Sequence, residues 1–144
     1  NKLTYEESKE ILGTPEERLF FALVDAISEI DVPKAMQTIA DLVKDGKEAR
    51  EILDGLELHL RNLLLILTCY KNLEPFGFME DEVKRYKHQA SNLLQSKEKV
   101  QFVLELMKML TDVGKGLMVN LDLQILLEKY VIECIIIKRK LEKV

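Results

Sequence analysis

The sequence predicts an all-α fold, a compact bundle of about five to six helices. The chain of 144 residues has only 6 Gly and 3 Pro, too few turn residues for the many short strands of a β-sandwich or β-barrel. Hydrophobic residues make up 47% and charged residues 32% of it, the balance of an ordinary globular domain. Apolar residues recur every three or four positions along most of the chain, which is the spacing of amphipathic helices.

Residues 1–13 are predicted to be a connecting segment that follows a module upstream of this sequence. A short helix is expected there, because Thr4 and Glu7 form a capping box and Gly13 stands where a left-handed stop would fall. The helical domain itself is predicted to occupy residues 14–144.

The first two helices of this domain have clear end signals. Thr14 supplies an N-cap hydroxyl, Pro15 suits the first helical position, and Glu17 completes a capping box. Asp31 caps a second helix, which is predicted to end at Gly46. Because almost no linker separates the two helices, they must pair as an antiparallel hairpin.

A third helix is predicted over residues 48–72, where leucine and isoleucine recur along one face. The segment 74–78 contains a Pro, a Gly and two Phe, and it breaks the chain into two helical halves. A polar helix is expected to follow over residues 80–94.

Two further helices complete the prediction. Ser96 is expected to cap the first of them, whose apolar stripe becomes uncertain at Gly114 and Gly116. Asn120 is expected to cap the last helix, 121–141, which ends in cations that suit the negative end of the helix dipole. This last helix is apolar on nearly every side. It must therefore lie at the centre of the bundle or meet another chain.

No motif for catalysis, cofactor binding or metal binding is found. The six glycines never form a phosphate-binding loop. The residue three positions before His59 is Leu56 and that before His88 is Arg85, which excludes the Glu-x-x-His pairs of a di-iron bundle. We therefore predict no catalytic residue, no cofactor and no metal, and we expect His59 on the polar flank of its helix.

Charge and hydropathy indicate in which compartment the chain works and which classes of partner it lacks. Its net charge of -4 argues against a domain that neutralises nucleic-acid phosphates. Every apolar stretch is far shorter than the roughly 18 residues that are needed to span a bilayer. Cys69 and Cys134 lie in apolar runs, where a free thiol behaves as a small buried hydrophobe. We predict a cytoplasmic protein with no nucleic-acid or membrane partner.

Several short motifs follow one another in a recognisable order. They are Ile11-Leu12-Gly13, Phe21-Ala22-Leu23-Val24-Asp25-Ala26-Ile27 with Asp31, Asp45-Gly46-Lys47, Ile52-Leu53-x-x-Leu56, Leu60-Arg61-Asn62-Leu63-Leu64-Leu65, and Asn120 with Leu126-Leu127-Glu128. In this order they resemble the carboxy-terminal helical domain of the bacterial DNA polymerase III gamma/tau subunit, the motor subunit of the clamp loader. The resemblance covers nearly the whole chain, with Leu121 where the family often has a Pro.

The resemblance implies an oligomerisation domain in the collar of a five-subunit clamp loader. Its partners would be other gamma/tau copies and the delta and delta-prime subunits. ATP hydrolysis, the structural zinc and most primer-template contacts belong to the amino-terminal modules of the family. Two alternatives are the equivalent collar of delta-prime and a free-standing helical adaptor that binds a peptide in a groove.

We predict that the last helix and the outer face of the helix before it, around residues 100–117, supply much of the intersubunit surface. Self-association of the domain is a further expectation. Arg61 interrupts an apolar run, so it should need a carboxylate or carbonyl partner. We expect an ion pair within the chain or, alternatively, a contact with another subunit. The candidate interface residues are Arg61, Val103, Met107, Leu110, Leu123, Leu127, Tyr130, Ile132 and Ile136.

Overall fold

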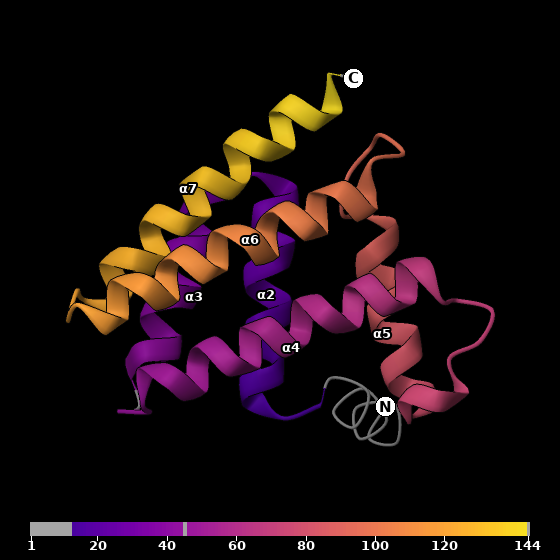
Figure 1. The fold of residues 1–144 in the computed structure, drawn as a ribbon, viewed down its shortest axis with the longest axis horizontal. Helices are drawn as coiled ribbons and strands as arrows, with labels where there is room; N and C mark the ends of the chain where they lie inside the picture. Colours follow the sequence, from indigo (N-terminus) through magenta and orange to yellow (C-terminus); the bar gives the residue numbers. More distant parts are fainter. Residues whose placement is uncertain (1–12, 45, 144) are drawn as a thin grey trace, which may run out of the picture.

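A computed structural model describes residues 13–44 and 46–143, and it confirms the all-α fold (Figure 1). The elements are α2 (Pro15–Glu29), α3 (Val32–Lys44), α4 (Ala49–Thr68), the 3-10 turn η1 (Glu74–Phe76), α5 (Glu80–Ser91), α6 (Lys99–Met118) and α7 (Leu123–Glu142). The short helix predicted before Gly13 lies outside the described residues.

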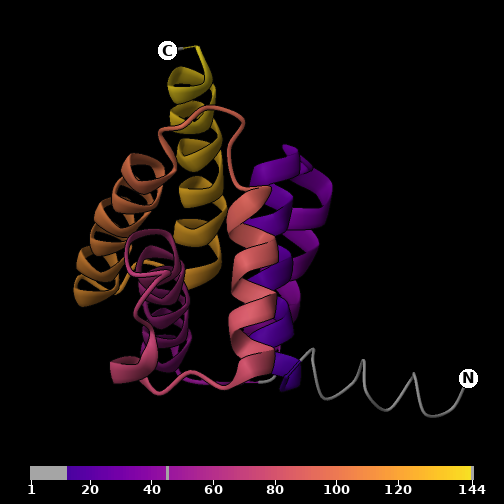
Figure 2. The ribbon, with the colours of Figure 1, turned by 90° about the vertical axis from the view of Figure 1, so that its right-hand side faces the viewer.

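The predicted starts of α2 and α3 are confirmed. The Thr14 hydroxyl accepts a hydrogen bond from the Glu17 backbone N–H at 3.1 Å, and the Asp31 carboxylate accepts one from the Lys34 backbone N–H at 3.1 Å. Ile30, between the two helices, has a φ of 56°, which turns the chain sharply. As expected for so short a connection, α3 returns along α2 (Figure 2).

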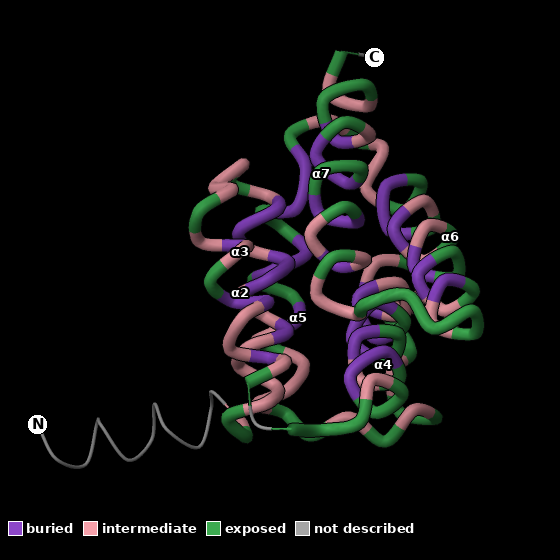
Figure 3. The backbone as a smooth tube through the Cα atoms, turned by 90° about the vertical axis from the view of Figure 1, so that its left-hand side faces the viewer, coloured by how far each residue is buried: buried purple, intermediate pink, exposed green. Residues whose placement is uncertain are grey.

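The helices form two layers. Helices α2, α3 and α5 make up one layer, and α4, α6 and α7 make up the other, with the buried faces of both turned inward (Figure 3). Both layers contribute fully buried side chains, among them Leu23, Ile27, Ile39, Leu60, Phe102 and Tyr130. None of the helices in the described ranges has the length and apolar content needed to cross a membrane.

The predicted cap of α7 is wrong. The Asp122 carboxylate, not Asn120, accepts the hydrogen bond from the Ile125 backbone N–H, at 3.3 Å. Asn120 instead has a φ of 63°, a left-handed conformation that Asn tolerates after the end of a helix. Helix α6 continues through Gly114 and Gly116 to Met118, so the last helix begins two residues later than predicted.

Two predicted helix ends are also too late. Helix α4 ends at Thr68 rather than at residue 72, and α5 ends at Ser91 rather than at residue 94. Leu93 and Leu94 are nevertheless buried. Both residues therefore lie in the connection between α5 and α6. Their apolar side chains continue the helical spacing of α5, so the spacing alone does not show where α5 ends.

Gly55 lets α2 and α4 pack closely, because a Cβ at this position would lie 2.5 Å from ring atoms of Phe20. Overpacking of this kind costs about 1–3 kcal/mol, against a gain in helix propensity of about 1 kcal/mol. We expect Gly55→Ala to lower the urea midpoint of unfolding. Gly114→Ala is the matched control, since the nearest atom to its Cβ would be 4.0 Å away, and it should be neutral or stabilising. Equal midpoints would show that the Phe20 ring moves aside at no cost.

Candidate functional site

Most of the exposed large hydrophobic side chains of the described residues lie on α6, on α7 or on the turn between them. Helix α6 exposes Val100 and Leu104, and the turn exposes Val119 and Leu121 next to Met118 at the end of α6. Helix α7 exposes Ile125, Ile132 and Ile136, which we call the α7 stripe. An apolar surface of this kind is typical of a site that meets another protein.

The α7 stripe lies along one side of its helix. Its three isoleucines are spaced seven and four residues apart, so they share a face, and they are 64%, 41% and 48% exposed in chain order. The opposite face of α7 is buried within the chain and includes Leu127, Val131 and Cys134. Helix α7 is thus apolar on two opposite faces, and the chain itself covers one of them.

Four of the predicted interface residues lie in the core of the chain itself. Val103, Leu110, Leu127 and Tyr130 are between 0% and 2% exposed, and the Tyr130 hydroxyl donates a hydrogen bond to the Leu106 carbonyl at 2.9 Å. They offer no surface to a partner in this fold, because α6 and α7 use this face to pack on each other and on the other helices. Met107 and Leu123 are half-buried against the core, whereas Ile132 and Ile136 are exposed.

Arg61 is exposed on α4, and it does not form the expected ion pair with any carboxylate that the structure describes. Its Nη1 donates to Oδ1 of Asn62 at 3.0 Å, and its guanidinium carbon lies 5.9 Å from the centre of the Phe76 ring. In the described ranges, no carboxylate lies within ion-pair distance of it. The alternative, a contact with another subunit, stays a prediction.

A buried polar network that was not predicted from the sequence joins α2, α4 and α5. His59 is 2% exposed, and its Nε2 donates to Oε1 of Gln89 at 2.6 Å. The Gln89 amide nitrogen donates in turn to the Asp25 carboxylate at 2.8 Å and to the Phe21 carbonyl at 2.9 Å. The prediction of His59 on a polar flank is therefore wrong, because α5 covers that flank.

Aromatic packing surrounds this network. The Phe21 ring lies 4.4 Å from the His59 ring and 4.8 Å from the Tyr86 ring, measured between centres. The Tyr86 hydroxyl accepts a hydrogen bond from the Asn62 amide at 3.1 Å. Within the described part of the chain, no group of three His, Cys, Asp or Glu side chains could hold a metal ion. The hydrogen bonds of the network join α2, α4 and α5 to one another.

Burial of His59 makes the stability of the domain depend on pH. Desolvation lowers the pKa of His59 to about 4, and the hydrogen bond to Gln89 only partly opposes this. In the unfolded chain the pKa returns to about 6.5, so the unfolded state binds the proton first as the pH falls. The free energy of unfolding should therefore drop by on the order of 3 kcal/mol between about pH 6.5 and about pH 4.

Urea unfolding of the native chain and of His59→Gln at pH 7.5 and pH 4.5 measures this contribution. The native chain should lose more stability over this interval than the variant, which lacks the titrating group. Equal losses in the two proteins would contradict the burial of a neutral His59.

The chain is similar to a known protein family over most of its length. The family model described as DNA polymerase III subunits gamma and tau domain III matches residues 3–128. The matched segment ends within α7, so Ile132 and Ile136 lie beyond it. Searches among curated proteins and among solved structures returned no match. Since the family match covers well over half of the chain and agrees with the helical motifs, this chain belongs to the family of domain III of the gamma and tau subunits of DNA polymerase III.

Proposed function

We propose that this chain is the oligomerisation domain through which a gamma/tau subunit joins the clamp loader, the pentamer that places the sliding clamp on DNA. Its partners are then other gamma/tau copies, delta and delta-prime. The family match supports the choice of gamma/tau over a delta-prime collar for this chain, because it names the gamma and tau subunits. The observation that carries the proposal is the α7 stripe, an apolar face that the chain leaves exposed.

Hydrophobic burial provides the driving force for such a contact. Removing apolar surface from water contributes about 25 cal/mol per Å², and a fully buried isoleucine contributes about 1.5–3 kcal/mol. Ile132 and Ile136 lie one helical turn apart, so a partner helix could cover both at once. Exposed cations at Lys129, Arg139 and Lys140 border the stripe, and they would form the polar rim of such a contact.

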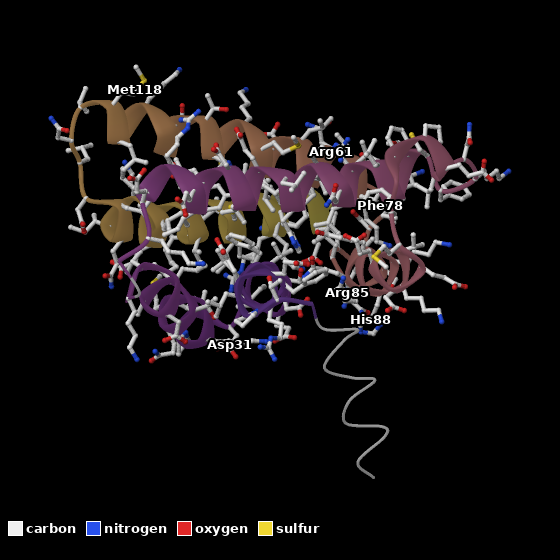
Figure 4. The ribbon with its side chains drawn as sticks, turned by 90° about the horizontal axis from the view of Figure 1, so that it is seen from below. Asp31, Arg61, Phe78, Arg85, His88 and Met118 are labelled. Atoms are coloured by element: carbon white, nitrogen blue, oxygen red, sulfur yellow. The ribbon has the colours of Figure 1, made fainter. Side chains whose placement is uncertain are left out.

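A subunit within a ring has two neighbours and so needs two different surfaces. We assign the α7 stripe to one neighbour. The second surface is the side of the molecule that bears Arg61 on α4 and Met118 at the end of α6 (Figure 4). Met118 is 82% exposed, and the Arg61 guanidinium has no carboxylate partner among the described residues, so both side chains are available to a second subunit.

Native mass spectrometry of the chain mixed with the helical domains of delta and delta-prime tests this function. We expect mixed complexes that contain all three components. A chain that stays monomeric with every loader partner, at concentrations at which the partners bind one another, would contradict the proposal. Assembly of the chain with itself alone would restrict the proposal to contacts between gamma/tau copies.

A further inference from the structure

A cavity of about 300 Å³ lies between α2, the start of α3 and α5. It is on the side of the molecule opposite to Arg61 and Met118 (Figure 4). Its rim consists of Arg18 from α2, Lys34 from α3, and Arg85 and His88 from α5, and Phe21 and Ala22 contribute apolar surface. The cavity is therefore separate from the second subunit surface proposed above.

The cavity has an excess of positive charge in a chain whose net charge is -4. No carboxylate of the described residues forms an ion pair with Arg18. Lys34 pairs with Glu29 at 3.3 Å, and its side chain remains 40% exposed. Asp25 is the acidic side chain among the described lining residues, and its carboxylate already accepts a hydrogen bond from Gln89.

Arg85 adds a further positive charge to the cavity, and it forms a long ion pair with Glu17. Its side chain is 11% exposed, and its Nε and Nη1 are buried with no hydrogen-bond partner among residues 13–44 and 46–143. The Glu17 carboxylate is 3.8 Å from Nη1, too far for a hydrogen bond. Because an arginine stays charged at any ordinary pH, this side chain gives the cavity a lasting positive potential.

The apolar surface of the cavity is held rigidly and is already in contact with other rings. Gln89 fixes α5 to α2 through its bonds to Asp25 and to the Phe21 carbonyl. The Phe21 ring packs on His59 and Tyr86, and the Arg85 guanidinium lies 5.8 Å from its centre. The part of Phe21 that lines the cavity is therefore a fixed apolar surface.

We propose that this cavity binds an acidic segment of another protein. An apolar side chain of the segment lies on Phe21 and Ala22, while flanking carboxylates pair with Arg18 and Lys34. Carboxylates complement the charge of the rim, and apolar pockets with a few placed charges are the usual form of a specific binding site. This proposal does not depend on the subunit contacts of α7.

A random peptide display library selected on the full chain tests the proposal. We expect the selected peptides to share an apolar residue flanked by Asp or Glu. Fluorescein-labelled copies of the most enriched peptide are then titrated with the native chain, Arg18→Glu, Lys34→Glu and Lys87→Glu. The first two variants should bind about tenfold or more weakly. Lys87 is exposed on α5 outside the cavity lining, so Lys87→Glu is the matched charge control and should bind nearly normally.

Circular dichroism confirms that each variant is folded, and assembly with the loader subunits should be unchanged in all three. Failure to enrich acidic peptides would overturn the proposal. So would an equal loss of binding in Lys87→Glu, because the interaction would then reflect net charge alone. A labelled oligothymidylate that binds the native chain and is lost in Arg18→Glu would assign the cavity to nucleic acid instead.

Discussion

Replacing Ile132 and Ile136 together by Glu should abolish association with the other clamp-loader subunits and leave the chain folded. Both side chains are exposed in the single chain, so the change costs the monomer little. In a complex that covers both positions, two carboxylates would lose their hydration without gaining partners. Central contact residues of this kind contribute about 2 kcal/mol or more each, so binding should weaken about a thousandfold.

Analytical ultracentrifugation with delta and delta-prime measures the association, and circular dichroism with urea unfolding measures the fold. Met79→Glu is the matched control, because Met79 is a 69% exposed apolar residue just before α5 and outside α4, α6 and α7. That variant should still associate. If the double variant unfolds, Ile132 and Ile136 are needed for the core. If it folds and associates normally, the subunit contact lies elsewhere.

Replacing Leu127 by Ala, in contrast, should strongly lower the folding stability of the chain. Leu127 is 0% exposed, and leucine-to-alanine changes at such sites lower the free energy of unfolding by about 2–5 kcal/mol. Ile125→Ala, on the outer face of the same helix, should change it by only about 0.5 kcal/mol. Urea unfolding followed by far-UV circular dichroism compares the two. Equal and small losses would show that the inner face of α7 is not packed as described.

The sequence was sufficient for the starts of α2 and α3, which depend on neighbouring residues. Thr14 and Asp31 cap their helices as predicted, because an N-cap bond reaches only two or three residues along the chain. The hairpin of α2 and α3 followed from the short connection between them. The family was also recognisable, since its motifs keep their order along the helices.

The sequence was insufficient where a helix is apolar on two faces. Periodicity marked both Leu127 and Ile132 as candidate interface residues, yet only the packing of neighbouring helices decides that Leu127 faces the core. Helix α7 packs on α6, the helix before it in the chain, and on α3, which is distant in sequence. The division of its apolar residues between core and surface is therefore a tertiary property.

The buried His59 had a partial signal in the sequence. His59 stands three residues after Leu56 and four before Leu63, both of which are in the core, and this spacing belongs to the inner face of α4. Its partner Gln89 is 30 residues away on a helix whose polar composition suggested an exposed position. The cationic cavity likewise combines residues of three helices, so no local sequence motif predicts it.

Methyl NMR of the isoleucine-labelled chain during titration with the delta and delta-prime domains tests the proposed interface most directly. The exposed methyl groups of Ile132 and Ile136 should shift or broaden as the complex forms. Those of Ile27 and Ile39, which are buried in the core, should stay in place and serve as internal controls. Complex formation that leaves Ile132 and Ile136 unchanged would contradict the assignment of α7 as the surface that joins this domain to the loader.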